Sequence, residues 1–367
     1  MKIALVAGLF LLAAVLMVPA GSFLYESGGP QACANCHEMG RQVDRWYASA
    51  HRNIPCGKCH GDALTLDAQF HMTNARRVAD HWRGKIGEQP RLKPQHVFSM
   101  VESCRQCHQQ EFAAWSSGPH SSSYERIFLD EKHNRTRHLM DDCLRCHGAH
   151  FDGAVRDIVT PVDNQGPWRL VREELRGKPV VPCLSCHAVH RPGSVLEERK
   201  LESRTLGNRQ EKHRPGLAFY DRRAMESVSV SLLPIPKVQD GGRLLKMSND
   251  PRQALCYQCH APLASRQVAS GDDRTPKGVH EGLSCLACHD KHRQTTRASC
   301  SNCHPRLSNC GRDVETMDTT FANPKSTYNI HWVTCADCHP KGVPARKAVP
   351  SWKTASAGAV APPVQAE

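Results

Sequence analysis

The sequence predicts a mainly α-helical chain with extensive coil, packed around covalently bound groups and carrying one N-terminal transmembrane helix. Three observations lead to this fold class: a cysteine motif that occurs nine times, the short stretches of chain between its copies, and an apolar N-terminal run. Helical patterns are modest and lie beside the motif copies. Coil is therefore expected to dominate elsewhere.

The cysteine motif is Cys-x-x-Cys-His, and it contains eighteen of the nineteen cysteines. It is typical of c-type haem attachment, in which two thiols bind one porphyrin and the adjacent imidazole ligates the iron. The motif therefore predicts a multihaem cytochrome c with nine covalently bound haem c groups. The copies are Cys33-Cys36-His37, Cys56-Cys59-His60, Cys104-Cys107-His108, Cys143-Cys146-His147, Cys183-Cys186-His187, Cys256-Cys259-His260, Cys285-Cys288-His289, Cys300-Cys303-His304 and Cys335-Cys338-His339.

Other uses of paired cysteines fit the pattern less well. Zinc ribbons need such pairs two at a time and do not require a histidine after the second cysteine. A thioredoxin-like motif would occur once, and a disulfide framework would not repeat a single spacing. Cys310 is the one cysteine outside the motifs, and it has no intramolecular partner once the other eighteen hold haem.

Length and charge are consistent with a chain organised by its haems. The 367 residues leave about 41 per motif, too few for each segment to build a core, so porphyrin faces should supply much of the buried apolar surface. The formal charge of +12 falls to about +3 in the oxidised state once propionates and irons are included. Lysine and arginine are scattered, and no nucleic-acid-binding motif is present, so we expect no nucleic-acid partner.

The N-terminal run predicts a membrane anchor. Residues 3–20 contain no charged side chain, and the apolar character continues to Tyr25. About 20 apolar residues span a bilayer. Lys2 precedes the run, so the positive-inside rule places the N-terminus in the cytoplasm and the remainder in the periplasm. A cleaved signal peptide, with small residues around Ala20, is the alternative.

Two further elements are predicted. The stretch from Asp67 to Lys85 contains few helix breakers and predicts a helix after the second motif. The turn signal Asp240-Gly241-Gly242 predicts a short hairpin within the longest interval between motifs.

The thirteen histidines outside the motifs are candidates for the sixth iron ligand, which separates electron carriers from enzymes. Histidines that lie four or five residues before a motif, or three residues after a motif histidine, are favoured as ligands, because covalent haem attachment already fixes the backbone beside them. His120 lies outside these positions and is included as a further candidate. The predicted distal ligands are His51, His120, His138, His150, His190, His280, His292 and His331. Position does not decide the role of His71, His81, His96, His133 and His213.

The first motif carries a methionine two residues after its histidine, so Met39 is a further candidate ligand. Its context, Cys-Ala-Asn-Cys-His-Glu-Met, is followed by Ser49-Ala50-His51, by Glu102-Ser103-Cys104 and by Gly148-Ala149-His150. With the apolar N-terminus, these motifs make residues 1–150 resemble the NapC/NirT/NrfH family of membrane-anchored tetrahaem quinol dehydrogenases.

The resemblance implies that Met39 ligates the first iron, either together with His37 or in its place, and that His51 and His150 are distal ligands to other haems of this module. It also implies a quinol pocket near the first haem, with a carboxylate that accepts a proton from quinol. Asp80 matches that carboxylate by position, and Asp67 is the alternative. The family's lysine has no clear counterpart here, which weakens the quinol assignment.

Four regions follow from these predictions. Residues 1–27 form the anchor, 28–155 a NapC/NrfH-like tetrahaem module, 156–342 a pentahaem extension with a haem-poor insert around 195–250, and 343–367 a disordered tail.

The predicted function is electron transfer from the quinol pool at the cytoplasmic membrane to periplasmic or outer-surface redox proteins. One alternative is a wire or complex subunit without a quinone site. A second is a reductase of small nitrogen or sulfur substrates, which requires an iron with an open distal position.

Overall fold

The computed structural model describes residues 27–61, 68–85, 94–190, 216–261, 273–293 and 328–342, with a few separate positions. Several predicted features lie outside the described residues: most of the N-terminal run, Asp67, residues 191–215, Cys310, the tail from residue 343, and the eighth motif apart from Cys303. In the part of the chain that is described, no helix is long and apolar enough to cross a membrane.

The described chain is mainly helical with much coil, as predicted. Most helices are short, and several begin or end at an attachment motif. The α-helices are α2 (His37–Tyr47), α3 (Gly57–His60), α4 (Ala68–Trp82), α5 (Pro94–Cys107), α6 (Gln109–Ser116), α7 (Tyr124–Phe128), α8 (Glu131–Asn134), α10 (Gln253–Cys256) and α11 (Cys335–Cys338).

Single turns of 3-10 helix connect these elements and include three of the motifs. They are η1 (Pro119–Ser121), η2 (Asp141–Arg145), η3 (Val155–Asp157), η4 (Glu173–Leu175), η5 (Cys183–Ser185), η6 (Val230–Leu232), η7 (Gly278–His280) and η8 (Cys285–Ala287).

Three antiparallel two-stranded sheets complete the described fold. Strand β1 (Val159–Thr160) pairs with β2 (Arg169–Leu170), β3 (Ala218–Asp221) with β4 (Glu226–Ser229), and β5 (Gln239–Asp240) with β6 (Arg243–Leu244). Isolated two-stranded ribbons are marginal in water, so these strands depend on packing against the rest of the chain.

Both elements predicted from local patterns are confirmed. The helix predicted over 67–85 is α4, and the predicted hairpin is β5–β6. The hairpin turn places Gly241 and Gly242 at φ 56° and 80°, a conformation that glycine adopts without steric cost.

A hydrophobic core forms around the fourth motif, from side chains between Phe98 and Val180. The sequence predicts that porphyrin faces supply most of the buried apolar surface, and in this region side chains also enclose a core of their own. Gly148, at φ 135°, lets the chain pass close to Tyr124 in this core. The core residues are Phe98, Tyr124, Phe128, Leu139, Leu144, Phe151, Val155, Ile158, Val159, Trp168, Leu170, Leu175 and Val180.

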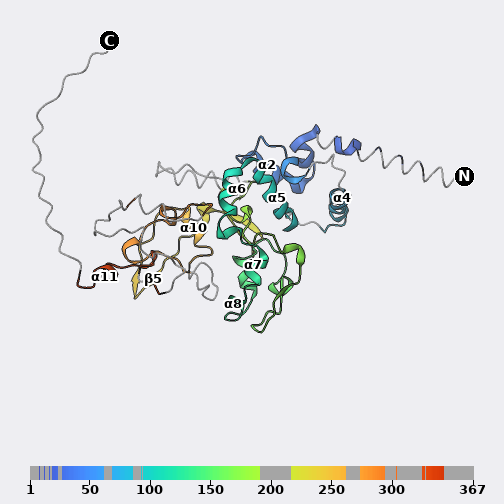
Figure 1. Cartoon of the computed structure of the whole chain (residues 1–367). Helices are drawn as coiled ribbons and strands as arrows, with labels where there is room; N and C mark the ends of the chain where they lie inside the picture. Colours follow the sequence, from blue (N-terminus) through green and yellow to red (C-terminus); the bar gives the residue numbers. More distant parts are fainter. Residues whose placement is uncertain are drawn as a thin grey trace, which may run out of the picture.

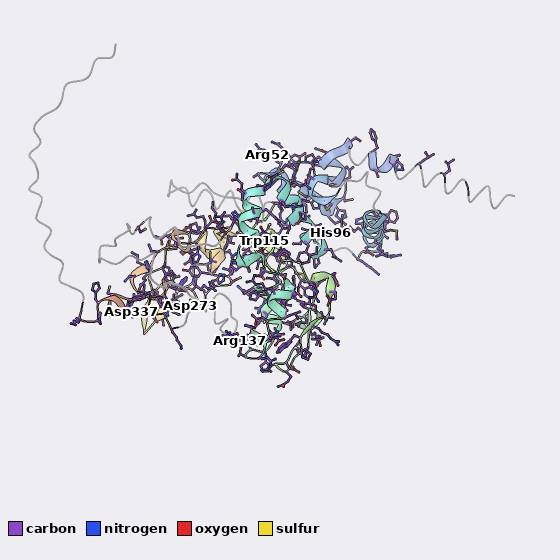
Figure 2. All side chains as sticks on the ribbon, viewed as in Figure 1. Arg52, His96, Trp115, Arg137, Asp273 and Asp337 are labelled. Atoms are coloured by element: carbon purple, nitrogen blue, oxygen red, sulfur yellow. The ribbon has the colours of Figure 1, made fainter. Side chains whose placement is uncertain are left out.

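The described elements extend across the molecule in rough chain order (Figure 1). Helices α2, α4 and α5 lie towards the N-terminal end, and α10, β5 and α11 lie at the opposite end, with α6 and α7 between them. Trp115, labelled in Figure 2, lies near the middle, where its Nε1 donates to the Val181 carbonyl oxygen at 3.3 Å. The motifs are therefore distributed along the whole body.

Candidate haem attachment sites and axial ligands

The attachment motifs share one local geometry. In seven of them the backbone N–H of the motif histidine donates to the carbonyl oxygen of the first cysteine, over 2.8–3.0 Å. One helical turn thus brings both thiols and the imidazole to adjoining positions, as attachment to a single porphyrin requires. These histidines are His60, His108, His147, His187, His260, His289 and His339.

The first motif has a different geometry. Helix α2 begins at His37, and Cys36 before it has an extended backbone, with φ −91° and ψ 122°. The His37 side chain is 84% exposed. The first motif therefore holds its histidine at the start of a longer helix and at the surface.

The cysteines are available for attachment. Those in the described part of the chain carry free thiols, and no disulfide joins any two of them. Free thiols spaced by two residues, followed by a histidine, are the donor set from which covalent haem c is made. The chemistry of the motifs therefore fits the group that the sequence predicts.

Six motif histidines each lie beside a second histidine from elsewhere in the chain. In every pair the imidazole ring centroids are 5.6–6.2 Å apart. The pairs are His37 with His81, His108 with His51, His60 with His190, His260 with His120, His187 with His292, and His289 with His331.

This separation fits two imidazoles on opposite sides of one iron. A metal–imidazole bond is about 2 Å long and the ring centroid lies about 1 Å beyond the nitrogen, which gives a centroid separation of about 6 Å. Two side chains that merely packed against each other would have no reason to repeat this distance six times. The pairs therefore fit six irons with two histidine ligands each.

Five of the eight predicted distal ligands belong to these pairs: His51, His120, His190, His292 and His331. His81 belongs to the sixth pair. The sequence analysis left the role of His81 undecided, since it is not close to any motif in the chain. The only sequence signal was its position on the predicted helix, now α4.

The other predicted ligands His138 and His280 are not members of the six pairs above. His138 is exposed. His280 has its Nδ1 3.0 Å from the Ile330 carbonyl oxygen. A main-chain carbonyl that accepts from Nδ1 leaves Nε2 as the ligating atom, and this arrangement is common around metals. His138 and His280 stay predictions.

His150 is held in a similar way. Its side chain is hydrogen-bonded to the main chain of Leu184, its ring stacks on Tyr220 with centroids 3.9 Å apart, and its buried Nε2 has no hydrogen-bond partner. Burial lowers the pKa of His150 to about 4, so the ring is neutral at pH 7. An orphaned, neutral Nε2 is costly unless a ligand satisfies it, which fits the predicted role.

At the first motif, a carboxylate joins the histidine pair. Glu38 Oε1 lies 2.5 Å from His81 Nδ1 and 3.4 Å from His37 Nε2. Glu38 is 11% exposed, and the ligand atoms of the three residues lie within 4.8 Å of one another. Carboxylates often orient a ligating histidine through its other nitrogen. Glu38 is therefore positioned to hold His81 beside His37.

The residues implied by the family resemblance lie near this group. Met39 is half-buried on α2, and its role as a ligand stays a prediction. Asp80 is half-buried on α4, directly before His81 in the chain. Of the nearby bases, Arg77 is exposed and its Nη2 lies 3.5 Å from His96 Nδ1.

Burial favours the neutral form of five of the paired histidines. It lowers the pKa of His120 and His190 to about 4, and it lowers the pKa of His51, His60 and His187 as well. Only a neutral imidazole can offer a nitrogen lone pair to iron. The fold therefore prepares these side chains for ligation.

Repeated attachment turns and histidine pairs define a multihaem c-type cytochrome, a class of electron-transfer protein. Two family models support this class. Residues 103–188, with the third to fifth motifs, match cytochrome c554 and c-prime, and residues 245–306, with the sixth to eighth, match cytochrome c7 and related cytochrome c. No curated protein and no solved structure matches the chain.

The matches leave the finer predictions open. Neither matched range includes residues 1–102, so the resemblance to the NapC/NirT/NrfH family stays a prediction. The first match extends across the domain boundary expected near residue 155, and two histidine pairs, His60 with His190 and His260 with His120, also join the two sides. The boundary itself stays a prediction.

Proposed function

We propose that the chain is a membrane-anchored nine-haem c-type cytochrome that carries electrons from the quinol pool to periplasmic or extracellular redox proteins. In this proposal residues 1–27 anchor it in the cytoplasmic membrane, and the haem-binding part lies in the periplasm. The six histidine pairs carry the electron-transfer part of the proposal. An iron with two imidazole ligands can change its charge by one electron without binding or releasing a substrate.

The first site supports quinol as the electron donor. Its residues lie on α2 and α4, at the end of the described body nearest the N-terminus (Figure 1). Oxidation of a quinol to a quinone releases two electrons and two protons. Haems held by the motif cysteines and the histidine pairs would accept these electrons one at a time. The Asp80 carboxylate would accept one proton, and solvent would accept the other.

The six pairs also bear on the alternatives. A reductase of small substrates needs an iron with an open distal position, and a histidine pair fills that position at each of these sites. A wire without a quinone site agrees with the pairs equally well. Quinol oxidation is therefore the step that needs an experiment.

The test uses full-length protein in membrane vesicles, with menadiol as the quinol. We expect absorbance at the reduced haem bands to rise within the mixing time of a stopped-flow experiment. The Asp80→Asn variant should slow this reduction by about 100-fold, the size typical of a lost general base. Asp44→Asn, an exposed carboxylate on α2, is the matched control and should reduce like the parent.

Two outcomes separate the parts of the proposal. If dithionite reduces the protein but menadiol does not, quinol oxidation is wrong and the wire without a quinone site replaces it. If menadiol reduces the parent and Asp80→Asn equally fast, quinol oxidation stands but Asp80 is not the proton acceptor.

A further inference from the structure

Contacts between the motifs do not follow their order in the chain. The first three motifs are consecutive in space. The Cys33 and Cys56 thiols hydrogen-bond to each other, which joins motif one to motif two. Helix α3, with motif two, packs against α5, which ends in motif three, and Cys59 lies close to Cys104.

Motif three then leads to motif five. The Cys104 and Cys183 side chains interact with each other. His187 of motif five also lies near His51 and His108. Nearby, Trp115 Nε1 donates to the Val181 carbonyl oxygen at 3.3 Å, which ties the chain after motif three to the chain before motif five.

Motif six contacts motif four directly. Arg145, inside motif four, donates from Nε to the Gln258 carbonyl oxygen at 3.1 Å and from Nη2 to Gln258 Oε1 at 3.2 Å. Gln258 lies inside motif six. The Cys146 and Cys259 thiols, one from each motif, also hydrogen-bond. These contacts join positions 113 residues apart in the chain.

Motif six also contacts motif seven. The Cys256 and Cys285 thiols hydrogen-bond to each other. Ser284, directly before motif seven, donates to Asp250 Oδ2 at 2.8 Å, just ahead of α10, which ends at Cys256. The two motifs are therefore held together by their flanking chain as well as by their thiols.

Motif five is the third neighbour of motif six. Cys186 lies near Cys256. Ala218 donates its N–H to the Cys186 carbonyl oxygen at 3.1 Å, and the guanidinium of Arg145 lies 5.8 Å from the centroid of the next ring, Phe219. Arg145 thus stands between the strand bound to motif five and Gln258 of motif six.

The histidines give the same arrangement. His120 is the partner of His260 in motif six. His147 in motif four and His289 in motif seven also lie near His120. The His120–His260 pair of motif six therefore lies near the histidines of motifs four and seven.

We propose that motif six is a junction that joins motifs four, five and seven. The spatial order is one, two, three, five, six and seven, and motif four stands on a side arm, where it contacts motif six through Arg145 and motif five through the hydrogen bond of His150 to the main chain of Leu184. This inference rests on the haem assignment of the proposed function and goes beyond it. Since tunnelling between irons weakens steeply with distance, the side arm lies outside the shortest route and offers electrons a second entry or exit.

The test is a measurement of iron–iron distances in the intact, haem-loaded protein, by cryo-electron microscopy or by anomalous diffraction at the iron edge. Intact mass, measured first on the same sample, counts the haems, so a wrong haem assignment is recognised separately. We expect the fourth iron to have the sixth as its nearest neighbour, and the third iron to be nearer the fifth than the fourth. A fourth iron that lies between the third and the fifth would overturn the junction.

Discussion

The sixth ligand of the first iron decides the potential at which electrons enter the chain, since a thioether raises that potential relative to an imidazole. His81 lies beside His37 and is held by Glu38, whereas Met39 is a candidate on the basis of its place two residues after the motif histidine and of the family resemblance. The geometry favours His81 as the sixth ligand. Single substitutions of His81 and of Met39 can test which of the two ligates the first iron.

We expect His81→Ala to convert one low-spin ferric haem into a high-spin one, because the iron loses an imidazole ligand. Met39→Leu, a substitution of similar volume, should leave the low-spin signals unchanged. Low-temperature electron paramagnetic resonance of the oxidised protein measures both. If Met39→Leu produced the high-spin haem and His81→Ala did not, methionine would be the ligand.

The buried histidines make the fold sensitive to acid. Burial lowers the pKa of His120, His150 and His190 to about 4, below the usual value of 6.5. Unfolded chains therefore bind protons between pH 6.5 and pH 4 that the folded chain does not. The stability that depends on neutral histidines is present above pH 6.5 and is lost as the pH falls to about 4.

We expect the free energy of unfolding, measured with guanidinium chloride at a series of pH values, to fall steadily from pH 6.5 to about pH 4. Iron ligation would also make the folded protein less stable in acid, since a ligated nitrogen cannot take a proton. A free energy that stayed constant from pH 7 to about pH 4 would show that these histidines are not held neutral by the fold.

At the scale of elements, ion pairs connect the β5–β6 hairpin to the chain before motif seven, one between Asp240 and Lys277 and one between Arg243 and Glu281. Glu281 accepts two hydrogen bonds from the Arg243 guanidinium, at 2.7 and 2.6 Å, and one from the Lys246 backbone N–H at 2.7 Å. The bonds from Arg243 are the main reason that the pKa of Glu281 falls to about 2. The Glu281 carboxylate therefore contributes stability above pH 4.5, which is lost as the pH falls towards 2.

We expect Glu281→Gln to lower the thermal unfolding midpoint and to increase hydrogen exchange in β6, because the bidentate pair is lost. Glu131→Gln is the matched control: Glu131 pairs with Arg135 on α8, and both side chains are more than half exposed, so little should change. Equal effects of the two substitutions would mean that the Glu281 contact does not hold the hairpin.

Elements with a local cause could be predicted from the sequence. The helix α4 follows from a stretch with few breakers, and the β5–β6 turn follows from Gly241 and Gly242. The β3–β4 hairpin was not predicted, because its strand residues carry no comparable turn signal. The core around Leu144 was also missed, because it is assembled from separate segments between Phe98 and Val180, and the attachment motifs give no signal of how those segments pack.

The haem sites also have a part that could be predicted from the sequence and a part that could not. The attachment motifs consist of neighbouring residues, so they can be recognised in the sequence. Histidine pairs depend on contacts between distant segments: the sequence favoured His190 as a ligand but could not assign it to His60, and it left His81 undecided. The order of motifs in space is a property of the whole fold, so no reading of neighbouring residues could give it.

At the scale of the whole molecule, the junction and quinol oxidation together predict the effect of removing single haems. Cys143→Ala with Cys146→Ala removes the fourth haem, and we expect menadiol to reduce all remaining haems of this variant quickly. Cys183→Ala with Cys186→Ala removes the fifth, which interrupts the route, so fast reduction should stop at the haems of motifs one to three. Stopped-flow absorbance measures the size of the fast phase.

If removal of the fourth haem stopped fast reduction at the haems of motifs one to three, electrons would pass through the sites in chain order. Each variant must first show the loss of a single haem by intact mass and a near-normal circular dichroism spectrum. Fast reduction by dithionite in both variants is the control that the remaining haems are accessible.

The central claim is that this chain holds its haems as bis-histidine electron carriers. Spin quantification of the fully oxidised protein by low-temperature electron paramagnetic resonance tests it most directly, because low-spin ferric signals count irons with two strong axial ligands. The six histidine pairs predict at least six low-spin haems in each chain. A spectrum dominated by high-spin haem, with fewer than six low-spin centres, would contradict the account.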